Sequence, residues 1–200
     1  GGRLPPASLE AIGLSELIVA DLELRHLVAA PGLELAATKL IFESGLAARV
    51  QVTSLNGLPA GSAFIGLSLL RRIAQAASIS DRPPVATSGQ GILTVLSQDT
   101  FSGAYRSIGA SGQYDPTQGR LTGVTPFSYA AGALPVLFDE QVSANVLAGH
   151  FGAEAALIAD AGERKGVLTL AGSDSPPGQA VLYASSQEPL IGEELYAARA

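Results

Sequence analysis

His150 is the side chain of this sequence best suited to acid–base chemistry, because an imidazole titrates near neutral pH and this one follows an apolar run. Asp174 and Ser88 follow two other apolar runs, so a Ser–His–Asp arrangement for nucleophilic hydrolysis is one candidate. Ser88 lacks the Gly-x-Ser-x-Gly turn that exposes such a nucleophile, which makes a hydrolase the weaker hypothesis. His150 and Glu154 are too few ligands for a metal, and their spacing favours a hydrogen-bonded turn.

Three glycine-containing turns, at residues 87–91, 149–154 and 172–175, follow these apolar runs. In a parallel sheet the turns would share the carboxyl edge, where backbone amides and the positive ends of the following helices favour a small anionic ligand. The alternative is that each glycine only permits a tight strand-to-helix turn. The residues predicted to line a ligand site are Thr87, Ser88, Gly89, Gly149, His150, Glu154, Ser173 and Asp174.

No turn completes a known cofactor motif. Neither Gly-x-Gly-x-x-Gly nor Gly-Lys-Ser/Thr occurs in the chain, so the sequence leaves the cofactor unknown and predicts no metal. The patterns that bind dinucleotides or nucleoside triphosphates in many α/β proteins are therefore absent from this sequence.

The elements that would position these turns centre on residues 121–172. Two short apolar runs end at Gly149 and Gly172, and a helix from Ala153 to Lys165 separates them, which is typical of a parallel βαβ unit. The run from Val85 to Gly89 also enters a glycine turn and a helix. We therefore predict an α/β fold of three layers, Rossmann-like and doubly wound, with a mainly parallel sheet of about five strands.

The other segments are less regular. Residues 39–43 and 48–53 are strand-like and are expected to form a hairpin at a sheet edge, unless one of them ends a helix. We place the α/β domain at 39–200 and a helical or irregular segment at 1–38. A helix from 63 to 78 is expected to bury a stripe that includes Phe64.

Two prolines are expected to interrupt helices. Pro135 should kink or divide the helix that begins at Thr125-Pro126, and Pro189 should break a helical stretch from 178 to 200.

The composition limits the classes of partner. Charged residues make up 15% of the chain, against roughly 25% in a typical soluble domain, and 47% of the residues are hydrophobic. The net charge is −6, and no basic cluster of the kind that nucleic-acid binding requires is present. This aliphatic surplus suggests a well-buried core, or a surface covered by identical subunits or a membrane-protein partner. The chain has no cysteine, which excludes disulfides, thiolate metal sites and cysteine catalysis. It also has no methionine, so we expect an excised domain.

Three segments, at 122–132, 149–154 and 190–195, resemble an uncharacterised prokaryotic domain family. The resemblance covers about residues 40–200. It implies a parent protein with transmembrane helices outside this fragment, so that the domain is membrane-associated on an undetermined side. It implies no reaction and no ligand.

Two functions follow as hypotheses. The first is a non-enzymatic, soluble ligand-sensing or assembly domain of a membrane-anchored protein. The second is a small-molecule enzyme with a strand-end site around His150, Asp174 and Ser88.

Overall fold

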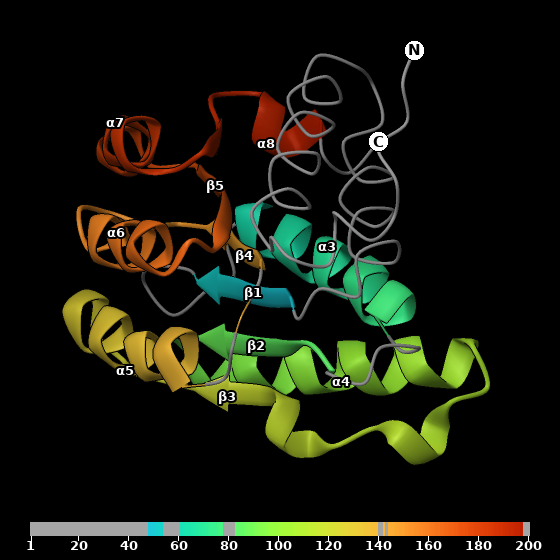
Figure 1. Cartoon of the computed structure of the whole chain (residues 1–200). Coiled ribbons are helices and arrows are strands. Elements are labelled where there is room, and N and C mark those ends of the chain that lie inside the picture. Colours follow the sequence, from blue (N-terminus) through green and yellow to red (C-terminus); the bar gives the residue numbers. More distant parts are fainter. Residues whose placement is uncertain (1–47, 54–60, 78–82, 140–141, 143, 198–200) are drawn as a thin grey trace, which may run out of the picture.

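A computed structural model describes residues 48–53, 61–77, 83–139, 142 and 144–197 (Figure 1). Segment 1–38 and the predicted strand at 39–43 therefore lie outside the described residues. The described strands are β1 (Ala48–Thr53), β2 (Val85–Ser88), β3 (Gly119–Leu121), β4 (Ala144–Gly149), β5 (Leu168–Ser173) and β6 (Glu188–Leu190). The described α-helices are α3 (Gly61–Ala77), α4 (Gly91–Ser107), α5 (Pro126–Asp139), α6 (Ala155–Lys165), α7 (Pro176–Ser185) and α8 (Glu194–Ala197).

The six strands form one sheet in the order β3-β2-β1-β4-β5-β6, and every neighbouring pair is parallel. The prediction of mixed helices and strands with parallel pairing is confirmed. β1 lies at the centre of the sheet, between β2 and β4. The prediction that Ala48–Thr53 belongs to a hairpin at a sheet edge is therefore wrong, because a parallel central strand needs crossover connections on both sides.

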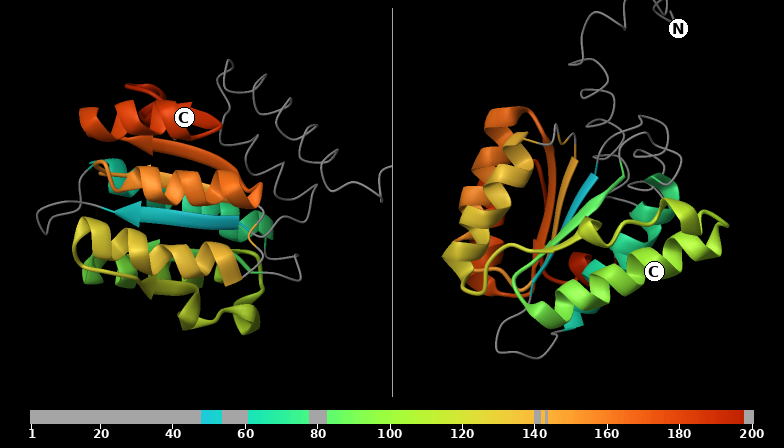
Figure 2. Two further views of the ribbon diagram at one scale, coloured as in Figure 1. Left: turned by 60° about the vertical axis from the view of Figure 1, so that its left-hand side comes forward. Right: turned by 90° about the horizontal axis from the view of Figure 1, so that it is seen from below.

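Helices lie against both faces of the sheet, as the view from below shows (Figure 2). α3 and α4 cover one face, while α5, α6 and α7 cover the other. Successive residues of β4 contribute to the two cores in turn, since Val146 and Ala148 join the α3–α4 core and Leu147 joins the opposite one. Strands buried on both faces are continuously apolar, which explains why the sequence shows runs instead of alternation.

The βαβ unit predicted from the sequence is present as β4, α6 and β5. α6 begins at Ala155, two residues later than predicted, and ends at Lys165. Gly166 caps it with a φ of 66°, in the left-handed region that favours glycine. The register pairs Val146 with Leu170 and Gly149 with Ser173, so both strands reach the carboxyl edge together.

Two strands at the sheet edges were not predicted. β3 and β6 have only three residues each, and they contain Arg120 and Pro189, neither of which is typical of a buried strand. Proline is tolerated at an edge strand because one side of that strand makes no ladder hydrogen bonds. The predicted helical stretch from 178 to 200 is accordingly replaced by α7, β6 and α8 within the described residues.

Two expectations about helices also need correction. Of the two outcomes expected at Pro135, a kink or a division of the helix, the division is wrong, because α5 runs from Pro126 to Asp139 with Pro135 inside it. Phe64 was expected in the buried stripe of α3, but its side chain is 54% exposed. The buried face of α3 is formed instead by residues such as Ile65, Leu69 and Ile73.

Candidate functional site

The turns after β2, β4 and β5 share one edge of the sheet. Because all strands are parallel, their carboxyl ends lie at the same side, with Ser88 in register with Val52 of β1 and Gly149 in register with Ser173. The Gly149 carbonyl accepts a hydrogen bond from the Asp174 amide at 3.2 Å. The turns that follow β4 and β5 are therefore in direct contact.

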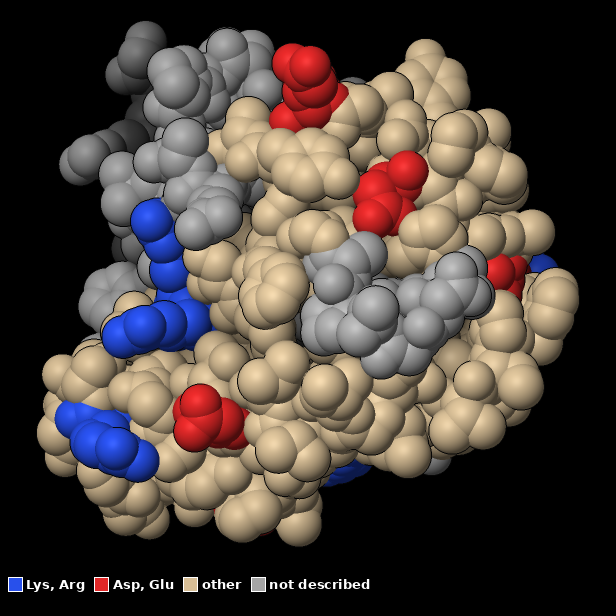
Figure 3. Space-filling model, turned by 180° about the vertical axis from the view of Figure 1, so that it is seen from behind, with Lys and Arg blue, Asp and Glu red and all other residues tan. Residues whose placement is uncertain are grey.

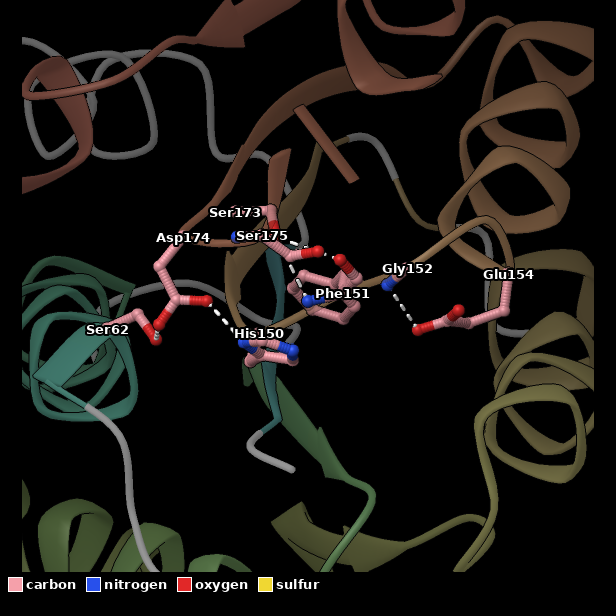
Figure 4. Close-up of polar contacts among 8 residues, drawn as sticks. All are labelled: Ser62, His150, Phe151, Gly152, Glu154, Ser173, Asp174 and Ser175. Carbon is pink, nitrogen blue, oxygen red and sulfur yellow. Dashed lines mark hydrogen bonds and ion pairs between the residues drawn. The ribbon is translucent and has the colours of Figure 1, made fainter. Parts of the chain in front are cut away.

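His150 and Asp174 form the central contact at this edge (Figure 4). The His150 Nδ1 lies 2.6 Å from Asp174 Oδ1, and the side chains are 29% and 16% exposed, respectively. Asp174 Oδ2 accepts a hydrogen bond of 2.5 Å from the Ser62 hydroxyl, which comes from the first turn of α3. Three elements, α3 and the turns after β4 and β5, thus fix the orientation of one imidazole.

The contacts of Asp174 determine which ring nitrogen of His150 carries the proton. An ionised carboxylate only accepts hydrogen bonds, so Nδ1 must donate to Oδ1. In the neutral imidazole Nε2 is then an acceptor, and no hydrogen bond to it is found among the described residues. Nε2 can accept from a hydroxyl, an amine or water, and after protonation it can donate to an anion.

Ser173 has a structural role at this edge. Its hydroxyl oxygen accepts hydrogen bonds from the amides of Phe151 and Ser175 and donates to the Phe151 carbonyl, at 3.0 to 3.1 Å. Gly178 of α7 packs directly on this link, because a Cβ there would lie 2.1 Å from the Phe151 carbonyl oxygen. The Ser173 hydroxyl holds the turn after β4, which carries His150, against the start of α7.

Residues at the end of β2 face different surroundings. Thr87 Oγ1 lies 3.2 Å from the Tyr129 hydroxyl, and both groups are buried. Burial raises the pKa of the Tyr129 phenol well above its usual range; the hydrogen bond to Thr87 opposes this shift and the charge of Glu154 adds to it. Ser88 and Gly89 are also buried, and no partner for the Ser88 hydroxyl is found in the described part of the chain.

The predicted Ser–His–Asp arrangement is not assembled as such. The hydroxyl that joins the His150–Asp174 pair belongs to Ser62, and it is bonded to the aspartate instead of the imidazole. The Ser88 hydroxyl makes no hydrogen bond to His150. In a nucleophilic triad the serine must donate to the histidine, so this geometry lacks the first link.

Glu154 is separate from the His150 side chain. It is buried, and its Oε1 accepts a hydrogen bond of 2.7 Å from the Gly152 amide. This is the hydrogen-bonded turn that the spacing of His150 and Glu154 favoured. Across the described ranges, no group of three or more His, Cys, Asp or Glu side chains lies close enough to hold a metal ion.

Ser62 is the site residue that the sequence did not reveal. A serine before an apolar helical stretch is an ordinary feature of a helix start, and 112 positions separate Ser62 from Asp174. Only the parallel order of β1, β4 and β5 brings the start of α3 next to the turn after β5.

The fold and this edge define a parallel α/β domain with a polar site at the strand ends. The chain belongs to the family described as "Domain of unknown function (DUF6754)", whose model matches residues 47–200. No curated protein and no solved structure matched the chain. The recognised family thus agrees with the prediction of a family of unknown function and assigns no reaction to the site.

Proposed function

We propose that this domain binds a small polar ligand at the carboxyl edge of its sheet, beside His150, and acts as the ligand-sensing part of a membrane-anchored protein. The observation that carries the proposal is the contact of His150 Nδ1 with Asp174 at 2.6 Å, supported from the other side by Ser62. Asp174 and Ser62 hold the imidazole in one orientation, which is useful in a site where Nε2 on the other side of the ring contacts a ligand.

The sheet order supports this location. We interpret the fold as Rossmann-like and doubly wound, because the order β3-β2-β1-β4-β5-β6 is the one that defines that architecture. Ligands of such sheets bind beyond the carboxyl ends of the strands, where the strand order reverses. Here the reversal lies between β1 and β4, and His150 directly follows β4. The fold itself carries no particular function, so the proposal depends on the side chains.

The chemistry of Nε2 suggests the kind of ligand. As an acceptor it suits a ligand hydroxyl, and as a donor after protonation it suits a phosphate or carboxylate. A sugar phosphate carries both groups, which agrees with the small anionic ligand expected from the glycine turns.

The membrane-anchored context and the prokaryotic origin rest on the family resemblance at 122–132, 149–154 and 190–195. Within the described residues no helix has both the length and the apolar character that crossing a bilayer requires. The anchor would therefore come from other segments. Fractionation of a longer native protein that contains this chain tests the point, and recovery in the soluble fraction alone would contradict it.

A second candidate is a small-molecule enzyme in which His150 is the acid or base. The specific observation in its favour is the same pair, since an Asp that fixes the tautomer of a His with its other nitrogen free is a common general-base arrangement. Neither Ser62 nor Ser88 donates to the imidazole, so such an enzyme would need its nucleophile from water or the substrate.

Ligand-observed NMR with ribose 5-phosphate, ribose and inorganic phosphate, followed by a small-molecule library, tests the binding proposal. We expect a compound that shifts the ring signals of His150 in protein-observed NMR spectra and binds His150→Ala at least tenfold more weakly. His26→Ala is the matched control, since the chain has only these two histidines. Equal binding to wild type and His150→Ala, or no ligand in the whole library, would refute the proposal. Turnover of a bound compound would favour the enzyme.

A further inference from the structure

A groove of about 530 Å³ lies between α3 and α4 and opens to solvent. α3 contributes Phe64, Leu67, Ser68 and Arg71 to its walls, and α4 contributes Asp99 and Thr100. The same groove is therefore lined by an exposed aromatic ring, an aliphatic side chain, one positive charge and one negative charge.

The apolar part of this groove extends along α4. Val95 lies one turn before Asp99 and Ile92 one turn before Val95, so the three share a stripe of the helix. Val95 is 63% exposed, and Ile92 is also exposed. Together with Phe64, which the sequence pattern had placed in the core, these side chains put three exposed hydrophobic residues on the α3 and α4 helices.

The two charges of the groove do not neutralise each other. Arg71 and Asp99 are both exposed, and no ion pair joins them in the described part of the chain. Arg71 is next to Arg72 in α3, and the view from behind shows two groups of basic side chains at its left, with an acidic side chain beside the lower group (Figure 3).

The lining of the groove carries one charge on each helix. Arg71 is the basic side chain of the α3 wall, and Asp99 is the acidic side chain of the α4 wall. The charge of Asp99 also acts on Tyr114, whose pKa is raised by burial and then by the charges of Asp115 and Asp99.

We infer that this groove is the interface of a symmetric homodimer, in which Arg71 of each copy pairs with Asp99 of the other and Phe64 of each copy fills the partner's groove. A two-fold axis brings residue i against residue j and j against i, so a surface with one basic and one acidic wall is complementary to itself. Arg71 and Asp99, which share no ion pair within the described residues, then gain a partner in both copies at once.

The size of the face sets the expected affinity. α3 and α4 have 17 residues each, which gives helices of about 25 Å that pack about 10 Å apart. Such a face is at the small end of specific protein interfaces, so we expect a dissociation constant in the micromolar range.

Sedimentation equilibrium of the 200-residue chain between about 2 and 200 µM tests the inference by charge reversal. Arg71→Glu and Asp99→Arg should each weaken the dimer by roughly tenfold or more, because each change acts twice and brings like charges together. The double variant R71E/D99R should recover an affinity close to that of wild type. Arg164→Glu is the matched control: Arg164 pairs with Asp160 on the exposed face of α6, and its reversal should leave the dimer unchanged.

Phe64→Ser provides a second, uncharged test. It should weaken the dimer at least as much as either reversal, whereas Tyr183→Ser, at an exposed aromatic of α7, should not. A monomer at every concentration overturns the inference. So does a dimer that survives both single reversals, or a double variant no tighter than the single ones. None of these outcomes depends on the ligand site at His150.

Discussion

Gly178 offers the sharpest test of how α7 positions the edge that carries His150. A Cβ at Gly178 would lie 2.1 Å from the Phe151 carbonyl oxygen and 2.7 Å from the Ser173 hydroxyl. An ordinary carbon–oxygen contact is more than an ångström longer than the first distance, and the carbonyl is backbone, so α7 or the turn after β4 must move. Gly178→Ala therefore overpacks the link between these two segments.

The magnitude follows from two opposing effects. Overpacking of this kind typically costs about 1–3 kcal/mol, while alanine in a helix gains up to roughly 1 kcal/mol over glycine. We expect Gly178→Ala to lower the free energy of unfolding by about 1–2 kcal/mol, which is roughly 2–8 °C in Tm for a chain of this size. The turn with His150 should also shift, which amide signals of Phe151 and Gly152 would report.

Gly103→Ala is the matched control, because Gly103 is also helical and a Cβ there meets nothing within 4 Å. It should raise the free energy of unfolding by about 0.5–1 kcal/mol. Urea denaturation of both variants in dilute solution gives the comparison. If both variants gained stability equally, the close approach of α7 to Phe151 would be wrong.

Three further predictions concern the same edge. Ser173→Ala removes one hydroxyl that makes three hydrogen bonds and should destabilise the fold by roughly 1–3 kcal/mol in urea denaturation; a neutral result would contradict its linking role. Tyr129 keeps its proton in the fold after the unfolded chain loses it, so stability should fall above about pH 10. Tyr129→Phe should reduce the loss of stability between pH 8 and 11, whereas Tyr183→Phe, at an exposed tyrosine, should not. Equal losses in wild type and both variants would show that Tyr129 does not cause the pH dependence. Asp174→Ala should convert His150 from a fixed Nδ1–H form to a tautomer mixture in nitrogen NMR spectra, and an unchanged tautomer would argue against the observed pair.

The central strands could be predicted from the sequence because they are apolar on both faces. The runs at Val85–Ser88, Ala144–Gly149 and Leu168–Ser173 are buried along their whole length and end near glycines. Their parallel arrangement follows from the helices between them. The short edge strands have three residues each and include Arg120 and Pro189, so they leave no comparable apolar run.

The contacts of the site were harder to predict. The residue types at His150 and Asp174 indicated a candidate pair, but their distance and the tautomer depend on the register of β4 and β5. Ser62 depends in addition on where α3 begins. For Phe64 the sequence predicted a contact that is absent: its helical spacing fits the buried stripe of α3, but its side chain is largely exposed. Periodicity reports a helical face without showing which neighbouring element covers it.

The central place of β1 has a consequence for synthesis on the ribosome. β1, β2 and β3 emerge first and can pair, but the other side of β1 has to wait for β4, which begins at Ala144. Until then the nascent chain presents an open row of backbone amides and carbonyls beside apolar side chains, a surface prone to aggregation. Chaperone demand should thus be greatest for translation intermediates that stop before that strand has left the exit tunnel.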